Sequence, residues 1–282
     1  GGLSLSEPVK EKTVSDLTES LGGSEVTSIE LDYYLQNLFV GTKDGKILHW
    51  NVGQKTGPEL LDVISATSGS EVAVTSLAFL LGDRSLVVGD QEGRVSVWFE
   101  VPEEDSPRGK ILKRIHELEP MELPITYLTA SARDRGFLAS DTDGNINLYH
   151  ATSGQLLDTV NTGARMVRRI SFAPKANGII AITDQGKLFN WNLRNNHPET
   201  NLKTLFGKVW YEGYSQPEYV WQSTGGSDEF EPKLSLTPLA FGTIKGAIYA
   251  LLFAIPLSIL SALCVSQFMH HGLRNVIKPS IE

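Results

Sequence analysis

The chain has one cysteine, Cys264, among its 282 residues. A single cysteine excludes an intrachain disulfide and a cysteine metal cluster, and it leaves the redox compartment undecided. The sequence also lacks the GxSxG nucleophile elbow and the HExxH zinc motif. We therefore expect no enzyme activity, no cofactor and no resident metal. We assign no catalytic, cofactor-binding or metal-binding residue, and the substrate-binding residues are unknown.

Charge is absent from one long stretch near the C-terminus, Gly246 to Met269, which holds 24 residues without a charged side chain. A helix of that length spans about 36 Å, enough to cross a hydrocarbon core of about 30 Å. The alternative is a buried helix of a soluble domain, which seldom needs such length. A secretory signal peptide is excluded by position. We expect a transmembrane helix, and Pro256 inside it favours a multi-helix bundle.

Basic residues are scarce in the rest of the chain. The net charge is −8, and the segment from Leu239 onward carries three basic groups and one acid, so the first 238 residues carry −10. An acidic module argues against nucleic-acid binding and against electrostatic docking on anionic lipid. Arg274 and Lys278 follow the apolar run closely, with His270 and His271 at its edge. The positive-inside rule puts that end in the cytoplasm, although Lys245 on the other flank acts in the opposite sense.

Four segments repeat one pattern, in which a turn glycine is followed five residues later by an aromatic residue. The glycines lie 48, 51 and 42 residues apart, a period typical of propeller blades. An acidic or amide residue before glycine suits a tight hairpin, and an apolar strand lies upstream of each turn. The repeats are Val40–Asn51, Val88–Phe99, Ala139–His150 and Ala181–Asn192.

The repeats resemble WD40-type propellers, although the Trp-Asp pair itself is absent; Trp50-Asn51 and Trp191-Asn192 come closest. We predict an all-β fold of WD40-like β-propeller blades, each with four antiparallel strands, followed by a C-terminal transmembrane α-helix. A β-sandwich is the alternative. Four repeats are few for a ring, so we expect a partial ring from a fragment of a longer protein.

The predicted boundaries follow from these features. They are residues 1–25 as a polar lead-in or the remnant of a preceding blade, 26–205 as propeller blades, 206–238 as an aromatic juxtamembrane segment and linker, 239–271 as the transmembrane helix and 272–282 as the start of a cytoplasmic loop.

Several candidate sites have simpler interpretations. Asp141–Asn145 resembles part of a calcium loop without its bidentate glutamate, and Gly41–Lys46 fails the phosphate-loop spacing, so both are predicted hairpin turns. Arg165, Arg168 and Arg169 are expected on a solvated face. The six histidines are scattered, at positions 49, 116, 150, 197, 270 and 271.

Phe206–Trp221 concentrates tryptophan and tyrosine between the repeats and the apolar run. Such rings prefer the headgroup level of a bilayer, which predicts an interfacial belt. An aromatic plug under the last blade is the equal alternative. The acidic stretch Gly225–Pro232 after it is expected to be a linker.

From Phe230 to Glu282 the sequence resembles phosphate ABC transporter permeases of the PstC type. The matching residues are Pro238, Leu239, Gly242, Thr243, Pro256, Lys278, Pro279, Ile281 and Glu282. Long bacterial members of that group are also similar in carrying a propeller-like extracytoplasmic insert.

This resemblance implies a fragment of the permease subunit of a binding-protein-dependent importer in the bacterial inner membrane, with the propeller in the periplasm. Its partners would be an ATPase subunit, a second permease subunit, the periplasmic phosphate-binding protein and the lipid bilayer. Thr243 and Lys245 would lie near the outer mouth, where lining is their expected role. The alternative is a membrane-anchored β-propeller interaction scaffold unrelated to transport, and a propeller enzyme is a third, disfavoured possibility.

Overall fold

The computed structural model describes residues 13–67, 71–163, 166–227, 229–270, 272, 273, 277 and 279. The sequence predictions for residues 1–12, Arg165, His271, Arg274, Lys278, Ile281 and Glu282 therefore lie outside the described residues.

Four antiparallel sheets follow one another along the chain, each built from strands that are neighbours in sequence. The first sheet holds β1 (Val26–Leu31), β2 (Asn37–Thr42), β3 (Lys46–Asn51) and β4 (Glu59–Ser65). The second holds β5 (Val74–Phe79), β6 (Ser85–Asp90), β7 (Val95–Pro102) and β8 (Lys110–Glu117). The third holds β9 (Ile125–Ala130), β10 (Gly136–Asp141), β11 (Asn145–His150) and β12 (Gln155–Asn161), and the fourth holds β13 (Val167–Phe172), β14 (Gly178–Thr183) and β15 (Leu188–Asn192).

The repeated hairpin forms as the sequence predicted. The four turn glycines, Gly45, Gly93, Gly144 and Gly186, all have φ between 76° and 80°, a conformation that L side chains rarely adopt. In the third repeat, Asp141 Oδ1 accepts the backbone N–H groups of Asp143 and Asn145, each at 2.9 Å. The local turn chemistry therefore fixes each hairpin.

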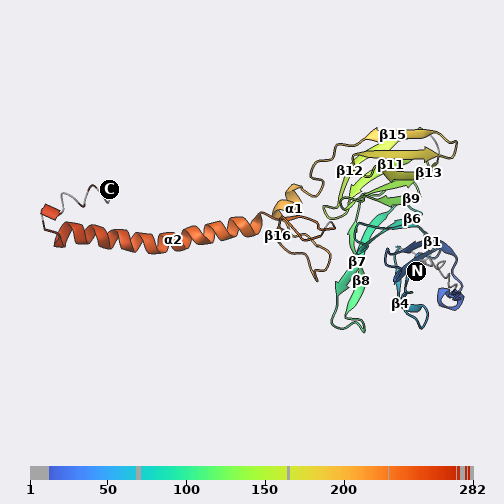
Figure 1. Ribbon diagram of the computed structural model, residues 1–282, viewed down its shortest axis with the longest axis horizontal. Helices are drawn as coiled ribbons and strands as arrows, with labels where there is room; N and C mark the ends of the chain where they lie inside the picture. Colours follow the sequence, from blue (N-terminus) through green and yellow to red (C-terminus); the bar gives the residue numbers. More distant parts are fainter. Residues whose placement is uncertain are drawn as a thin grey trace, which may run out of the picture.

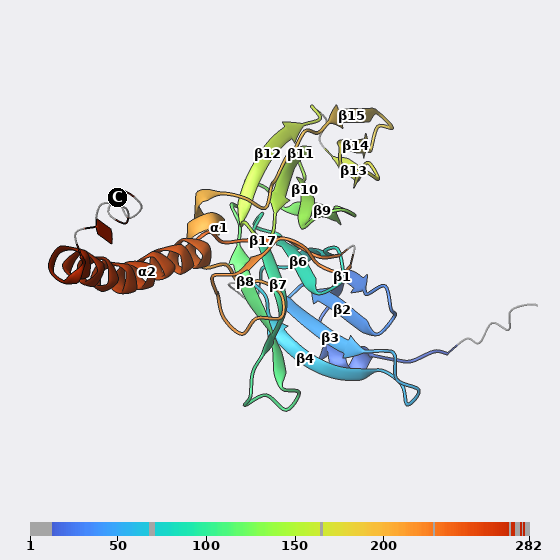
Figure 2. The ribbon, with the colours of Figure 1, turned by 60° about the vertical axis from the view of Figure 1, so that its left-hand side comes forward.

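The sheets pack face to face through three apolar clusters. Phe39 and Ile47 of the first sheet meet Leu77 and Trp98 of the second. The second and third sheets share a cluster that includes Val97 and Phe137, and the third and fourth share one that includes Leu138 and Ala181. The innermost strands β1, β5, β9 and β13 contact each other in that order. These are propeller blades, fanned out in sequence order (Figure 2).

The fan is an open arc. No core cluster of the described residues joins the first sheet to the fourth. Ile29, on the outward face of β1, is 62% exposed, and Leu188 in β15 is 70% exposed. The two ends of the arc thus present apolar side chains that a closed ring would cover.

The first and fourth sheets, at the two ends of the arc, are flanked by different structures. A 3₁₀ turn, η1 (Thr18–Leu21), lies against the first sheet, where Leu17 and Leu21 pack on Leu48 and Trp50. Within the described part of the chain the fourth sheet has three strands, so the expectation of four strands in every blade is wrong there. The chain instead leaves β15 through the polar residues 193–201 into the short helix α1 (Leu202–Phe206).

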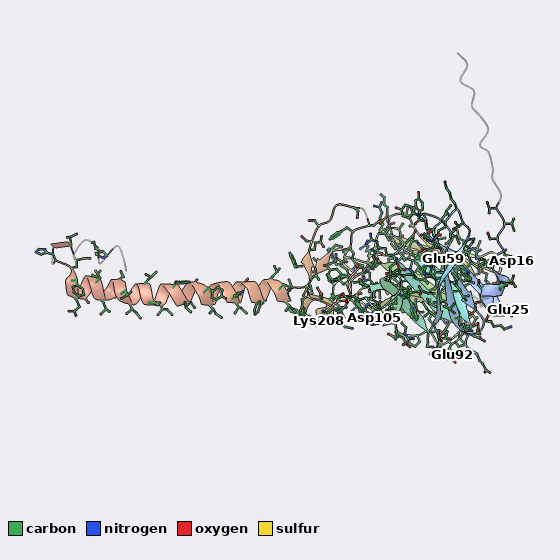
Figure 3. All side chains as sticks on the ribbon, turned by 90° about the horizontal axis from the view of Figure 1, so that it is seen from below. Asp16, Glu25, Glu59, Glu92, Asp105 and Lys208 are labelled. Atoms are coloured by element: carbon green, nitrogen blue, oxygen red, sulfur yellow. The ribbon has the colours of Figure 1, made fainter. Side chains whose placement is uncertain are left out.

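A long helix, α2 (Thr237–Leu263), projects away from the sheets and continues as a π-helical turn, η2 (Cys264–Phe268) (Figure 1). None of its residues is buried, and its side chains extend on all sides into free space (Figure 3). The span from Thr237 to Phe268 is long and apolar enough to cross a membrane, and Lys245 is its one charged residue. A helix that is apolar all round needs an apolar surrounding.

Candidate functional site: the junction between propeller and helix

The segment between the last blade and α2, residues 202–227 and 229–236, is called the junction segment here. It holds α1, a pairing of Val209 with Glu218, and the two-stranded β16 (Trp221–Gln222) and β17 (Lys233–Leu234). Instead of staying beside the fourth sheet, it runs back to the second and third sheets before α2 begins (Figure 1). It is therefore the part of the molecule that sets how α2 meets the propeller.

Apolar and aromatic side chains attach the junction segment to the second sheet. Val209 and Tyr211 are buried, at 5% and 4% exposure. The Trp210 ring meets Phe99 of β7 edge-on at 6.4 Å between centroids, and its Nε1 donates to the Tyr214 carbonyl at 2.8 Å. The aromatic plug thus exists, but it lies on the second sheet and not under the last blade.

Other aromatic residues of the same segment remain exposed. Phe206, Tyr219 and Trp221 are 56%, 43% and 42% exposed, close to the start of α2. These three are free to take the headgroup position that an interfacial belt requires. The packed part of the segment therefore corresponds to the aromatic plug, and the interfacial belt stays a prediction.

A buried ionic cluster forms the second attachment. Arg135, just before β10, donates from Nη2 to Glu212 Oε2 at 2.8 Å, and its Nε lies 3.9 Å from Glu231 Oε2. Glu212 also accepts the Ser85 hydroxyl at 2.5 Å. The side chains of Arg135, Glu212 and Glu231 are only 7%, 12% and 13% exposed. Buried charges of this kind are costly to separate, so the cluster holds the segment on both middle sheets.

The environment of this cluster raises the pKa of two ionisable groups, Glu231 and Tyr211. Burial raises the pKa of Glu231 to about 7, against the opposing effects of a Thr152 hydrogen bond and the Arg135 charge. Burial also raises the pKa of the Tyr211 phenol to about 12, with the Glu231 charge acting in the same direction. Glu231 is therefore poised to change its protonation near neutral pH. In Gly225–Pro232, the expected linker, Phe230–Pro232 are partly buried, whereas Gly225–Ser227 and Glu229 are exposed.

The first turn of α2 is tied to the junction by hydrogen bonds. The Ser235 and Leu236 amides donate to the carbonyls of Val220 and Leu205, at 3.0 and 2.7 Å. The Thr237 hydroxyl donates to the Phe206 carbonyl at 3.1 Å. Proline in the first turn, Pro238, fits a helix start because its missing N–H would have no partner. The helix therefore emerges from a packed base.

A cavity of about 400 Å³ lies between the first and second sheets, beside the junction segment. Phe39, Phe79 and Leu86 give it an apolar wall, while Arg84, Lys110 and Glu212 supply charges. Next to it, Arg108 pairs with both Asp62 and Glu100. Its volume lies within the range of small-molecule pockets, and its lining mixes apolar with charged side chains.

The residues singled out from the sequence are placed as follows. Gly41–Lys46 and Asp141–Asn145 are hairpin turns, as predicted. Arg168 and Arg169 are exposed, and the Arg169 guanidinium lies 5.1 Å from the Tyr127 ring centroid. Thr243 and Lys245 are exposed on α2.

Three of the described histidines lie in three different sheets, His49 in β3, His116 in β8 and His150 in β11. His49, His116 and His150 are largely enclosed, and burial lowers the pKa of each, to about 4 for the latter two. Among the residues that the structure describes, no group of three His, Cys, Asp or Glu side chains could hold a metal ion.

Sequence reasoning missed the Arg135–Glu212–Glu231 cluster. Arg135 is 77 positions from Glu212 and still further from Glu231, and nothing in the local pattern marks these residues as buried. A possible signal was Glu212 itself, a charged residue between Tyr211 and Gly213 in a segment rich in aromatic residues.

Comparison with known proteins supports the fold. No family model matches the chain. The β-propeller domain of Cps50 (Swd1) from Myceliophteria thermophila is similar over 67% of this chain and 62% of its own length, with 17% identity and a TM-score of 0.52. The computationally designed Ika4 protein matches 61% of this chain and 93% of its own length, with 22% identity and a TM-score of 0.48. At 17% identity the likeness to the Cps50 domain concerns the fold alone, a β-propeller.

Proposed function

We propose that the chain is part of the membrane-spanning permease subunit of a bacterial phosphate ABC importer, with its propeller on the periplasmic side of the inner membrane. The observation that carries the proposal is α2, an exposed apolar helix that rises from a packed base on the propeller. Its sequence, with Pro238, Gly242, Thr243 and Pro256, resembles the span that opens the permease core in PstC-type proteins.

The proposed orientation rests on the charges around the helix. Arg274 and Lys278 follow it, and basic residues beside a span are retained in the cytoplasm. The acidic propeller then faces the periplasm, away from the anionic inner leaflet that would repel it. ATP hydrolysis belongs to a separate subunit in this proposal, since the chain carries no nucleotide-binding motif.

The propeller itself is proposed to bind or regulate, and not to catalyse. A natural partner is the periplasmic phosphate-binding protein, which must approach the outer mouth of the permease. Because apolar and ionic contacts hold the junction segment on the blades and hydrogen bonds tie α2 to that segment, a partner docked on the blades would act on the helix without passing through a flexible linker.

The test is to isolate the intact protein from native membranes in detergent. We expect an ATPase subunit and a second permease subunit to co-purify, and we expect proteoliposomes of the complex to import phosphate when the binding protein and ATP are supplied. Absence of the ATPase subunit, together with unchanged phosphate uptake in cells lacking the protein, would exclude the importer assignment.

The second candidate is a membrane-anchored interaction scaffold, and the open arc favours it. The exposed apolar ends of the first and fourth sheets are surfaces on which another polypeptide could pack. In the same isolation, this candidate predicts that a different protein co-purifies and that no transport subunit does.

A further inference from the structure

The fourth sheet ends in a strand with one side unused. In the first three sheets, the strands β3, β7 and β11 each pair on their outer side with β4, β8 and β12. β15 occupies the same place in the fourth sheet, yet among the described residues it pairs only with β14. An unpaired edge of this kind is a template for another strand.

The alternation of hydrogen bonds between β14 and β15 shows which main-chain groups of β15 point to the open edge. The Leu193 amide donates to the Asn177 carbonyl at 2.9 Å, and the Thr183 amide donates to the Lys187 carbonyl at 3.0 Å. In an antiparallel ladder, bonded residues alternate along the strand. Phe189 and Trp191 therefore point their main-chain groups toward β14, while those of Leu188, Asn190 and Asn192 point to the open edge.

Side chains beside this edge also lack the cover that their counterparts have. The aromatic residues equivalent to Trp191 are Trp50, Trp98 and Tyr149, which are 1%, 5% and 0% exposed. Two of these lie opposite a leucine of the outer strand, Trp50 opposite Leu60 and Tyr149 opposite Leu156. Trp191 is only partly buried.

The outer strands β4 and β12 indicate which sequence would pair with β15. β4 has the sequence ELLDVIS and β12 has QLLDTVN, so both carry two adjacent leucines and then an aspartate. The first leucine lies opposite the aromatic residue, and the register shifts directly after it. In β12, Leu156 packs into the cluster on one face and Leu157 into the cluster on the other, so the strand uses both leucines.

The net charge around β15 indicates which charge a segment bound at its edge should carry. Residues 166–195 contain five basic side chains and one acid, Asp184, which gives a formal charge of +4 in a chain whose net charge is −8. Lys187 and Arg194 flank β15 directly, and both are exposed. A second copy of β15 would bring the same cations together, whereas an acidic strand would meet them favourably.

We propose that the free edge of β15 binds an extended acidic segment of a partner protein, which adds antiparallel as the fourth strand of the last blade. The segment carries a Leu-Leu-Asp core, with its first leucine opposite Trp191 and its aspartate opposite Asn190. Main-chain hydrogen bonds supply the affinity and the leucines supply the specificity. This inference does not depend on the importer assignment.

The experiment uses the full chain in detergent and a probe peptide, acetyl-QLLDTVN-amide, copied from β12. Hydrogen exchange should slow at the amides of Leu188, Asn190 and Asn192 when the peptide is added, while those of Phe189 and Trp191 stay as protected as before. Asn190→Pro removes a central edge donor and should weaken binding at least about tenfold, whereas Asn190→Ala keeps the donor and should bind normally.

A peptide control removes any dependence on how Asn190→Pro folds. Methylating the aspartate nitrogen of the peptide blocks the amide that faces Asn190 and should abolish binding, while methylating the next nitrogen, which faces solvent, should not. Replacing the aspartate by lysine should also weaken binding. The proposal is wrong if exchange at the three edge amides does not change, or if both methylated peptides bind equally. It is also wrong if those amides are already protected in a concentration-dependent dimer, because the occupant would then be a second copy.

Discussion

A carboxyl group enclosed among other charges makes the junction sensitive to pH at the scale of single residues. Burial raises the pKa of Glu231 from 4.5 to about 7, so the folded chain holds this proton more tightly than the unfolded chain. The stabilisation is complete below about pH 4.5 and is lost as the pH rises through about 7. The charges of Arg135, Glu212 and Lys233 also act on the pKa of this carboxyl group.

We predict that Glu231→Gln removes this loss. The amide keeps the size of the side chain and stays neutral, so the variant should lose about 3 kcal/mol less stability than the wild type between pH 5 and pH 8. Chemical denaturation across that range measures the difference. The buried His116 and His150 act in the opposite direction, because their lowered pKa makes stability rise with pH; they affect both proteins equally and cancel in the comparison. An exposed control, Glu122→Gln, should follow the wild-type curve.

At the scale of elements, the repeated hairpins share a conformation but not a neighbourhood. The turn glycines Gly93 and Gly186 have nearly equal φ values, 78° and 76°. A Cβ on Gly93 would lie 2.2 Å from the Met121 carbonyl oxygen, whereas a Cβ on Gly186 meets nothing within 4 Å. The second turn is packed under the link between two sheets, and the fourth is open.

This pair separates backbone strain from packing. Gly186→Ala should lower the free energy of unfolding by about 1 kcal/mol, because alanine is strained in the left-handed conformation. Gly93→Ala must also displace backbone atoms, so it should lower the free energy of unfolding by about 3 kcal/mol or more. Thermal denaturation of the two variants measures both values. Equal losses would mean that the link at Met121 moves freely, contrary to its hydrogen bond with Gly93.

At the scale of the whole molecule, the junction decides whether the propeller and α2 act as one unit. In Figures 1 and 2 the helix leaves the blades on the side where the junction segment lies. Trp210, Glu212 and Glu231 attach that segment to sheets that are distant in sequence. A continuous set of contacts therefore runs from the blades through the junction segment to the start of α2.

We predict that Arg135→Met loosens this coupling, because it leaves Glu212 and Glu231 together without their shared cation. The single cysteine, Cys264, is exposed beyond α2 and accepts one spin label, and a second can be placed by Lys55→Cys in the loop between β3 and β4. The distance distribution should be narrow in the parent and broad with Arg135→Met. The neighbouring control Arg133→Met should leave it narrow, and a broad distribution in the parent would contradict the packed junction.

The amino-acid sequence by itself determined the hairpins, the blades and the apolar helix. Gly45, Gly93, Gly144 and Gly186 carry the left-handed turns, strand alternation sets which side chains face inward, and 24 uncharged residues in a row make α2 apolar all round. These features depend on interactions between residues that are near in the chain, so they are visible without a structure.

Only the tertiary structure decided how the pieces meet. Arg135 finds Glu212 across 77 positions, the aromatic segment packs on the second sheet instead of the last blade, and β15 keeps an unpaired edge. Each outcome depends on which surfaces come together once the sheets have stacked. Contacts between distant segments leave no periodic trace in the sequence, because a buried Arg135 and an exposed Arg133 occupy the same kind of turn.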